Sequence, residues 1–539
     1  MFVRGIPILI SSAVDTGNIP APRPCDLLAD RLGQNAMRTL QAPAEYMPLS
    51  ERLQDPEQYM YLQQKKRAQL ESLLWIEPNP AILECMVDLI VMICEEGSWS
   101  VNRMGVDDPA RPAIDVQAAE TGMLFAWILR RHGARLAEYS PRIQSVMLSE
   151  VRRRLLAPIL AHEDYPFMRL IGSCPALIMS DLLLTCVLME KNPARRQQPV
   201  KLLLRLLDKI CASQSDPSAP IEERVADACA IADLARLLKR VTRGELDLTR
   251  SVPPAGWLDD LIIPWIQGEL FVNPAGDTMR PRIAGMDLFR LGHLTRERSL
   301  CALGVQLGNI TEQSGFSLSG RILNMEYMRA AQDECGNPPR LRRAAAENGS
   351  LMVSRLDNMF AAIAGMGNRA NAGDVTLFAD GAPILVDAGG AVHSLPMIDD
   401  CFPTFQPVKL PHTDADFSQD RDLMSVDLSE TYPEACPVAS YQRTLITSRA
   451  EGVVRLVDAF EFSEPVKEVV FRFVTAQKPI SLRECVRMGP VDLSWDGEML
   501  PEITELPVSD AFTGGSWLVS LRMQNVPRRF ICGFTFERN

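Results

Sequence analysis

The feature that most constrains this 539-residue chain is a change of hydrophobic period near residue 336. Before that point, apolar residues recur at intervals of three and four, as in Ile82, Met86 and Leu89, which indicates amphipathic helices. After it, apolar and polar residues alternate, as over 453–462, which indicates strands with one buried face. The chain is also too long for a single core. The sequence therefore predicts a helical domain followed by a β domain.

Residues 1–50 are rich in proline and weakly periodic, so we expect an extended or loosely helical lead-in there. Residues 51–335 repeat helical hairpins with short connections. Helices are expected over 80–94, 118–131, 140–156, 176–190, 200–212, 222–242, 257–268 and 295–307. Such a series predicts an α/α toroid or a helical array.

Residues 336–539 form the predicted β domain. Strands are expected over 351–355, 359–364, 375–378, 384–386, 441–448, 453–462, 466–474 and 516–523. The pair 375–378 and 384–386 is joined by Asp380-Gly381, a dipeptide that suits the positive φ angles of a tight hairpin. This many strands favours an antiparallel two-sheet sandwich. The acidic stretch 411–427 matches no calcium loop, and we interpret it as a solvated turn.

Composition excludes several classes of protein. A net charge of −12 argues against a nucleic-acid partner, which normally requires a basic excess. The 13 cysteines are scattered singly, as expected of reduced thiols in a cytoplasmic protein. No run approaches the ~18 apolar residues of a membrane span, and the N-terminus has no signal-peptide pattern. We therefore expect a cytoplasmic location and no membrane partner.

A possible polar site follows the second strand of the hairpin. Asp387 ends that strand beside two glycines, and His393 follows six residues later. A carboxylate and an imidazole at a strand end form either half of a metal site or a hydrogen-bonded pair. The spacing alone favours the structural pair.

The hairpin over 373–390, followed by His393-Ser394-Leu395-Pro396, resembles the start of the β domain of heparinase II/III-like polysaccharide lyases. The segments 93–100 and 178–185 resemble other segments of that family in the same order, so the resemblance covers most of the chain. It implies an α/α toroid followed by an antiparallel β-sandwich. It also implies β-elimination on an acidic, uronate-containing oligosaccharide bound in an interdomain cleft.

The family's catalytic residues are not retained at the matching positions. The family segment that carries the carboxylate-neutralising asparagine matches 173–177, which contains no asparagine. The family's Pro-Ala-His matches 102–104, which includes Arg103 and no histidine. The expected tyrosine near Glu223 is absent. The family's His-Asn-His-Asn-Asp element matches 367–371, which places Gly367 at the catalytic histidine and Arg369 at a metal-binding histidine.

Substitute groups exist elsewhere in the sequence. Tyr165, His162 and Arg369 are candidate catalytic residues, since elimination requires a base and a group that neutralises the carboxylate. A packing or loop role for Tyr165 and His162 remains the alternative.

For the ligand, Trp99, Arg103 and Asn368 are candidate substrate-binding residues. Asp387 and His393 keep two of the family's metal-ligand positions. We favour a pair between Arg369 and Asp387 over a bound divalent metal, because a guanidinium supplies a fixed positive charge at the same place.

Two functions follow from the sequence. The first is lyase-type β-elimination on an acidic oligosaccharide with an altered catalytic set. The second is a catalytically degenerate relative that binds a glycan or serves as a scaffold, because a fold can be kept after its catalytic residues are lost.

Overall fold

The computed structural model describes the chain in segments. Described are all residues except 12–18, 43–44, 102–106, 214–218, 273–278, 309–314, 335–340, 347–348, 366–371, 387–392, 404–411 and 508–514. The described residues form two compact units. The helical unit comprises Met1–Gln214, Glu222–Ala255 and Ile283–Pro338. The β unit comprises Ser215–Ile221, Gly256–Arg282 and Pro339–Asn539.

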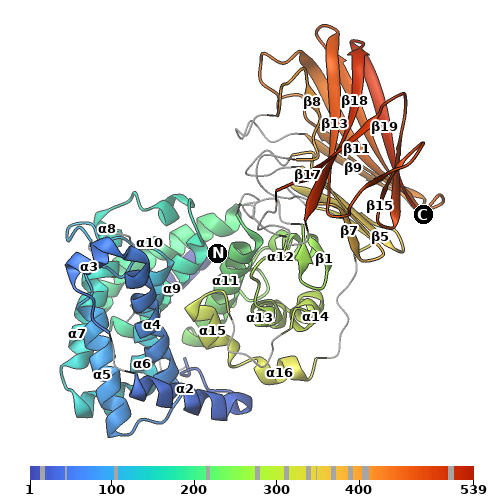
Figure 1. The fold of residues 1–539 in the computed structure, drawn as a ribbon. Helices are drawn as coiled ribbons and strands as arrows, with labels where there is room; N and C mark the ends of the chain where they lie inside the picture. The colour runs from blue at the N-terminus through green and yellow to red at the C-terminus, as the bar shows by residue number, and fades with distance from the viewer. Residues whose placement is uncertain are drawn as a thin grey trace. The chain divides into compact units, whose positions relative to one another are not determined.

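The helical unit is built from a series of helices with short connections (Figure 1). They are α1 (Ile6–Leu9), α2 (Ala29–Gln41), α3 (Leu49–Gln54), α4 (Pro56–Leu74), α5 (Pro80–Cys94), α6 (Val116–Tyr139), α7 (Ile143–Val151), α8 (Pro158–Ala161), α9 (Pro175–Met189), α10 (Pro193–Ala212), α11 (Ile221–Val241), α13 (Gly285–Thr295), α14 (Arg298–Gln306), α15 (Leu318–Asn324) and α16 (Met328–Gln332). Neighbours in this series pack against each other, α9 on α10 and α13 on α14. The expected α/α toroid is confirmed.

Local sequence signals explain where the helices near the centre of this unit begin. Asp55 caps α4 by accepting a hydrogen bond from the Gln58 amide at 2.9 Å, and Pro56 occupies the first helical position. Asp115 caps α6 in the same way. The middle of α6 is buried on all sides because it packs on α4, α9 and α15.

The first 50 residues contribute regular structure to this unit. α1 contacts α10, and α2 contacts α4. On α2, the buried residues Leu32, Ala36 and Thr39 recur at helical spacing and face the unit's interior.

The β unit holds two large antiparallel sheets within the described residues. The strands are β3 (Arg343–Ala345), β4 (Leu351–Arg355), β5 (Met359–Ala364), β6 (Val375–Ala379), β7 (Ala382–Leu385), β8 (Met397–Ile398), β9 (Thr413–Phe417), β10 (Arg421–Asp427), β11 (Val438–Ser448), β12 (Val453–Phe462), β13 (Val466–Thr475), β14 (Ile480–Ser481), β15 (Val486–Met488), β16 (Val491–Trp495), β17 (Pro501–Leu506), β18 (Ser516–Val526) and β19 (Arg529–Arg538). One sheet has the order β14-β15-β16-β19-β12-β11-β10-β9. The other has the order β17-β18-β13-β7-β6-β5-β4-β3, with β8 beside β13.

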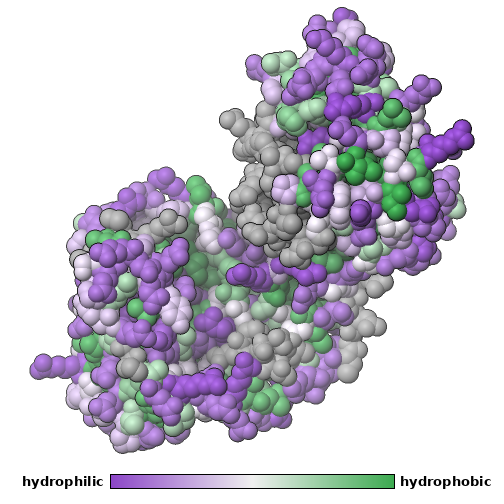
Figure 2. All heavy atoms as spheres, viewed as in Figure 1, coloured by the Kyte–Doolittle hydropathy of each residue, from purple (hydrophilic) through white to green (hydrophobic). Residues whose placement is uncertain are grey.

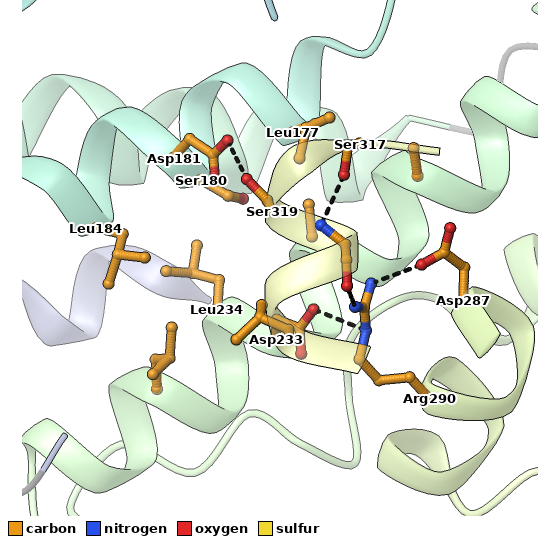
Figure 3. Close-up of a pocket in the computed structure, with 15 residues that line it drawn as sticks. Leu177, Ser180, Asp181, Leu184, Asp233, Leu234, Asp287, Arg290, Ser317 and Ser319 are labelled. Carbon is orange, nitrogen blue, oxygen red and sulfur yellow. Dashed lines mark hydrogen bonds and ion pairs between the residues drawn. The ribbon is translucent and has the colours of Figure 1, made fainter. Parts of the chain in front are cut away.

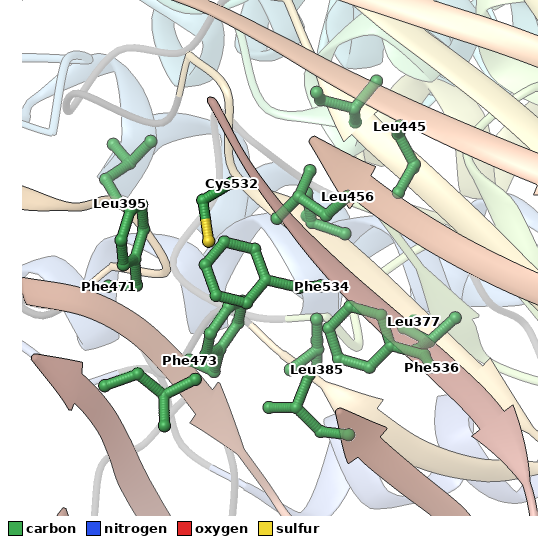
Figure 4. Packing of buried hydrophobic residues seen from close by; sticks show 14 of the residues in the cluster. Leu377, Leu385, Leu395, Leu445, Leu456, Phe471, Phe473, Cys532, Phe534 and Phe536 are labelled. Carbon is green, nitrogen blue, oxygen red and sulfur yellow. The ribbon is translucent and has the colours of Figure 1, made fainter. Parts of the chain in front are cut away.

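The core of the sandwich lies between these sheets (Figure 4). Leu377 and Phe471 come from one sheet, and Leu456 and Phe534 come from the other. The rings of Phe471 and Phe534 lie 4.7 Å apart between centroids. The expected antiparallel sandwich is confirmed, and its inward residues follow the period of two seen in the sequence.

The hairpin predicted around Asp380-Gly381 is confirmed as β6 and β7. Asp380 has φ 49° and Gly381 has φ 79°, the left-handed values that this turn requires.

Two local predictions are wrong. The helix expected over 257–268 ends early: α12 covers Ala255–Ile262, and β1 (Trp265–Gln267) pairs with β2 (Leu270–Phe271). Pro264 explains the change, because proline lacks the amide hydrogen that a continuing helix needs. The described residues of this segment, 256–272 and 279–282, pack on the outer face of the β4-β5-β6 region, where Ile266 and Phe360 of β5 belong to one hydrophobic cluster.

The stretch 411–427 is the second error. Its described part is the hairpin β9–β10, not a solvated turn. Asp422 is fully buried, and its oxygens accept hydrogen bonds from Arg449, Arg343 and Ser354. Burial opposes ionisation of Asp422, but these hydrogen bonds outweigh it and lower the pKa.

The described helices include none whose length and hydropathy suit a membrane crossing.

Candidate functional site

Trp99 is a core residue of the helical unit. Only 1% of its surface is exposed, and its indole Nε1 donates a hydrogen bond to the Ile93 carbonyl at 2.8 Å. Its ring meets Phe125 edge-on, and the Arg154 guanidinium lies over it at 5.2 Å. Both the polar atom and the ring faces are therefore occupied within the protein.

His162 and Tyr165 lie together on the segment after α8, with ring centroids 6.3 Å apart. A ring nitrogen of His162 is 2.9 Å from the Ala110 carbonyl oxygen. The hydroxyl of Tyr165 donates to the Pro112 carbonyl at 2.8 Å, and burial raises the pKa of this phenol to about 12. These contacts fasten the segment after α8 to the segment before α6.

His393 lies in the β unit and is 7% exposed. Its Nδ1 is 3.3 Å from a carboxylate oxygen of Asp374, whose other oxygen accepts from the Ser394 amide at 3.0 Å. Nowhere in the described part of the chain do three His, Cys, Asp or Glu side chains gather as metal ligands. The described groups thus form a hydrogen-bonded pair and do not complete a metal site.

Four predicted site residues lie outside the described residues. They are Arg103, Asn368, Arg369 and Asp387. The proposed pair between Arg369 and Asp387 therefore stays a prediction.

A groove of about 910 Å³ opens in the helical unit where α2, α4, the start of α6 and α15 meet. It is lined by Asn35, Arg38, Thr39, Tyr61, Gln64, Lys65, Arg67, Ala68, Gln69, Glu71, Ser72, Val101, Val116, Gln117, Glu120, Ser173, Phe316, Leu318 and Arg321. We call it the helical groove. On the face shown in Figure 2, hydrophilic side chains cover most of the surface around this unit. None of Trp99, His162 and Tyr165 is among the lining residues.

One wall of the groove is a polar face of α4. Tyr61, Lys65 and Ala68 recur at intervals of four and three, so they share one face of the helix. Tyr61 is 56% exposed, which leaves its ring and hydroxyl open to the groove.

Positive groups enter the groove from three helices. On α2, Arg38 is exposed and forms no ion pair with any described residue. On α4, Lys65 pairs with Glu45 at the surface. On α15, the Nε and Nη2 atoms of Arg321 lie 3.3 and 3.1 Å from a carboxylate oxygen of Glu71.

Glu120 is the groove's least neutralised acid. It lies in the second turn of α6, is 9% exposed, and accepts a hydrogen bond from the Ser319 amide at 3.1 Å. Burial raises the pKa of its carboxyl to about 7, and the hydrogen bond from Ser319 offsets only part of this. A carboxyl with a pKa near neutrality in a groove is typical of a functional site.

A small buried pocket of about 30 Å³ lies on the other side of Ser319 (Figure 3). The Ser319 hydroxyl donates to Asp181 at 2.6 Å, so one residue bridges Asp181 and Glu120. Arg290 pairs with Asp233 at 3.2 Å and with Asp287 at 3.4 Å. Burial raises the pKa of Asp181 well above its usual value, and the nearby charge of Glu120 adds to the effect.

Sequence reasoning missed the helical groove. Its residues come from four helices that are distant in sequence, and each looks like part of an ordinary solvated helix face. The available signal was weak, namely that Tyr61, Lys65 and Ala68 share one face of a weakly amphipathic helix.

Comparison with known proteins gives a fold and no closer relationship. The sequence matches no protein-family model, and no curated protein matches it. Among solved structures, heparan sulfate lyase HepC from Pedobacter heparinus is similar, with a TM-score of 0.59, 10% identity, and coverage of 89% of this chain and 77% of that chain.

Two further structures agree. Heparinase III has a TM-score of 0.56 at 10% identity, covering 92% of this chain and 79% of its own. A variant of chondroitin AC lyase from Streptomyces coelicolor A3 has a TM-score of 0.58 at 11% identity, covering 99% of this chain and 82% of its own. The chain thus has the fold of these polysaccharide lyases, as the resemblance in its sequence implied.

Proposed function

We propose that this protein binds an acidic, uronate-containing oligosaccharide in the helical groove and acts on it by lyase-type β-elimination. The observation that carries the proposal is the groove itself: in a chain with a polysaccharide-lyase fold, it combines an exposed tyrosine with cations from three helices.

The size and lining of the groove suit such a ligand. About 910 Å³ lies near the upper end of the volumes of ordinary ligand pockets, ~300–1,000 Å³. Arg38 presents a guanidinium that can bind a carboxylate with two parallel hydrogen bonds. Tyr61 and Phe316 provide rings for contact with the apolar faces of sugars.

The reaction requires four changes at a uronate unit. A base removes the proton on the carbon next to the carboxylate, the bond from the neighbouring carbon to the glycosidic oxygen breaks, and a double bond forms between the two carbons. The leaving oxygen takes up a proton. We assign removal of the proton to the deprotonated hydroxyl oxygen of Tyr61, which then passes that proton to the leaving oxygen. Neutralisation of the carboxylate is assigned to Arg38, because both side chains are exposed in the groove.

The alternative function is glycan binding without catalysis. It is favoured by the hydroxyl of Tyr165 and the Nε2 of His162, which are hydrogen-bonded to backbone carbonyls. A binding protein needs the cations and rings of the groove but no base.

The proposed reaction does not involve a metal. His393 is paired with Asp374, and the described residues do not complete a ligand set, so we assign no step to a metal. We retain the proposal that Arg369 pairs with Asp387 in its place. Tight divalent-metal binding by the purified protein that Asp387→Ala abolishes would contradict it.

The test is absorbance of the carbon–carbon double bond during incubation with heparan sulfate, chondroitin sulfate and alginate oligosaccharides, with and without divalent metal. Elimination predicts a rise in the wild type that Tyr61→Phe abolishes while thermal stabilisation by the sugar persists. Tyr139→Phe is the matched control, since this exposed tyrosine lies at the far end of α6 and outside the groove.

Binding without catalysis predicts a flat trace with sugar-dependent stabilisation. That stabilisation is lost in Arg38→Ala and kept in Arg31→Ala, an exposed arginine of α2 that does not line the groove. A flat trace without stabilisation by any member of the panel would overturn both functions.

A further inference from the structure

The carboxyl of Glu120 is placed where an acidic ligand must come close to it. Glu120 lines the helical groove together with Arg38 and Arg321, the cations to which an acidic sugar would bind. Its own hydrogen bond comes from a neutral backbone amide, that of Ser319. It has no direct ion pair with any described residue.

The charges around Glu120 act in both directions, since Arg321 favours its ionised form and Glu71 opposes it. From α4, Glu71 faces it and is itself paired with Arg321 of α15, so that guanidinium is shared. From α9, Asp181 and the thiol of Cys174 lie near enough to feel its charge. Behind Asp181, Asp233 of α11 adds a further negative group.

Hydrogen bonds connect Glu120 and Asp181 through a single residue, Ser319. Ser319 donates to Glu120 through its amide and to Asp181 through its hydroxyl, and Figure 3 shows the contact with Asp181. Ser317 caps the same helix by accepting from the Gly320 amide at 2.8 Å. Two buried carboxyls therefore face one short helix whose only described cation toward the groove is Arg321. A ligand carboxylate that binds to Arg38 or Arg321 comes close to the carboxyl of Glu120, and the two repel each other when both are ionised.

We propose that an acidic oligosaccharide and a proton enter this groove together, with Glu120 as the residue that takes up the proton, an inference that rests on the proposed function. A proton on Glu120 removes the repulsion between its carboxylate and the ligand's carboxylate. By linkage, the ligand then binds more tightly where Glu120 is protonated.

The direction in which ligand affinity changes with pH follows from the residues that line the groove. None of the described lining residues is a histidine or a cysteine, and Glu120 is a lining group that changes charge near neutrality. Its pKa of about 7 places the change between pH 6 and 8. Because one proton is involved, the dissociation constant can rise by at most about tenfold per pH unit, and we expect about three- to tenfold weakening from pH 6 to pH 8.

The experiment is titration calorimetry of the full chain with an unsulfated chondroitin tetrasaccharide, whose only charges are carboxylates. The wild type is measured at pH 6, 7 and 8, and at pH 7 in two buffers that differ in ionisation enthalpy. We expect weaker binding at higher pH and net proton uptake on binding. The tetrasaccharide with its carboxyls reduced to alcohols serves as the control, and we expect no proton uptake with it.

Two variants locate the proton. Glu120→Gln keeps the shape and an acceptor for the Ser319 amide, and we expect its affinity to equal that of the wild type at pH 6 and to stay constant up to pH 8. Asp181→Asn removes the other carboxyl on Ser319, and we expect the pH dependence to persist. A pH dependence that survives Glu120→Gln, or that Asp181→Asn alone abolishes, would overturn the inference.

The experiment distinguishes failure of the role proposed for Glu120 from failure of the proposed ligand. Binding that is independent of pH and takes up no proton in the wild type refutes the role of Glu120 while leaving the proposed ligand intact. Absence of binding at every pH, in the wild type and in Glu120→Gln alike, refutes the proposed ligand itself. Should Glu120→Gln fail to fold, proton uptake by the wild type decides alone.

Discussion

A buried ion pair of the β unit and two buried carboxyls beside the helical groove differ in how their charge is matched. In the β unit, Asp458 is fully buried and accepts two hydrogen bonds from Arg443, each at 2.8 Å, and one from the Tyr441 hydroxyl. Arg443 also donates to the carbonyls of Gly373 and Ser394, so the charges of this buried pair are matched.

In the helical unit, by contrast, Glu120 and Asp181 are bridged by a serine, and neither forms an ion pair with a residue that the structure describes. Burial raises the pKa of both. Matched buried pairs fix a structure, whereas carboxyls held near their titration point are typical of binding and catalytic sites. This difference is why we place the function in the helical groove.

Breaking the matched pair gives the largest expected effect. Asp458→Asn removes the charge while keeping the shape, which leaves Arg443 buried without its counter-charge. We expect a loss of about 3–5 kcal/mol in the stability of the β unit, measured as the shift of its denaturant midpoint. Asp492→Asn is the control, since its partner Arg487 is partly exposed, and we expect a loss below about 1 kcal/mol. Equal losses in the two variants would contradict the contrast.

For Glu120, removing the charge is expected to raise the stability of the protein, the opposite of the effect at Asp458. The pKa of Glu120 is raised on folding, so its contribution to stability is fully present below the unfolded pKa and is lost as pH rises through about 7. We therefore expect Glu120→Gln to stabilise the helical unit at pH 8, on the order of 2 kcal/mol, and to have little effect near pH 4.5.

This effect is measured by thermal unfolding followed through the helical circular dichroism signal at both pH values. Glu163→Gln, at an exposed carboxylate, is the control and is expected to change neither. A destabilised Glu120→Gln at pH 8 would show that the carboxylate is favourably solvated after all.

The architecture was predictable from the sequence because it depends on local periodicity. The interval of three and four in α5 and the alternation in β12 each report a buried face, and Asp380-Gly381 reports a turn. The resemblance to lyases then selected one arrangement of these elements.

The errors concern interactions between distant residues. The acidic composition of β10 suggests solvation, yet Asp422 is buried because Arg343 and Arg449 reach it from other strands. The groove was missed for the same reason: Tyr61, Arg38 and Glu120 acquire a common environment only when α2, α4 and α6 pack. Pro264 was the one exception, a local signal that was available in the sequence.

A smaller effect tests the assignment of Tyr165 to structure. Tyr165→Phe leaves the Pro112 carbonyl without its hydrogen bond in a buried position, and we expect a loss of about 1–2 kcal/mol in unfolding free energy. The same variant should keep any sugar-dependent signal of the wild type. Tyr139→Phe, at an exposed ring, should leave stability unchanged. Loss of activity in Tyr165→Phe without loss of stability would restore this tyrosine as a catalytic candidate.

The smallest expected effect on stability comes from breaking an exposed ion pair. Arg111 pairs with Asp164 at 2.7 Å on the surface beside Tyr165, and both side chains are about half exposed. Water and salt screen such a pair, so we expect Arg111→Ala to cost less than about 1 kcal/mol and the cost to shrink further in high salt. Denaturant midpoints of wild type and variant at low and high salt provide the measurement. A cost that exceeds that of Tyr165→Phe and does not depend on salt would mean that the cation–π contact of Arg111 with the Tyr165 ring, at 5.7 Å, fastens this segment more strongly than the buried hydrogen bond does.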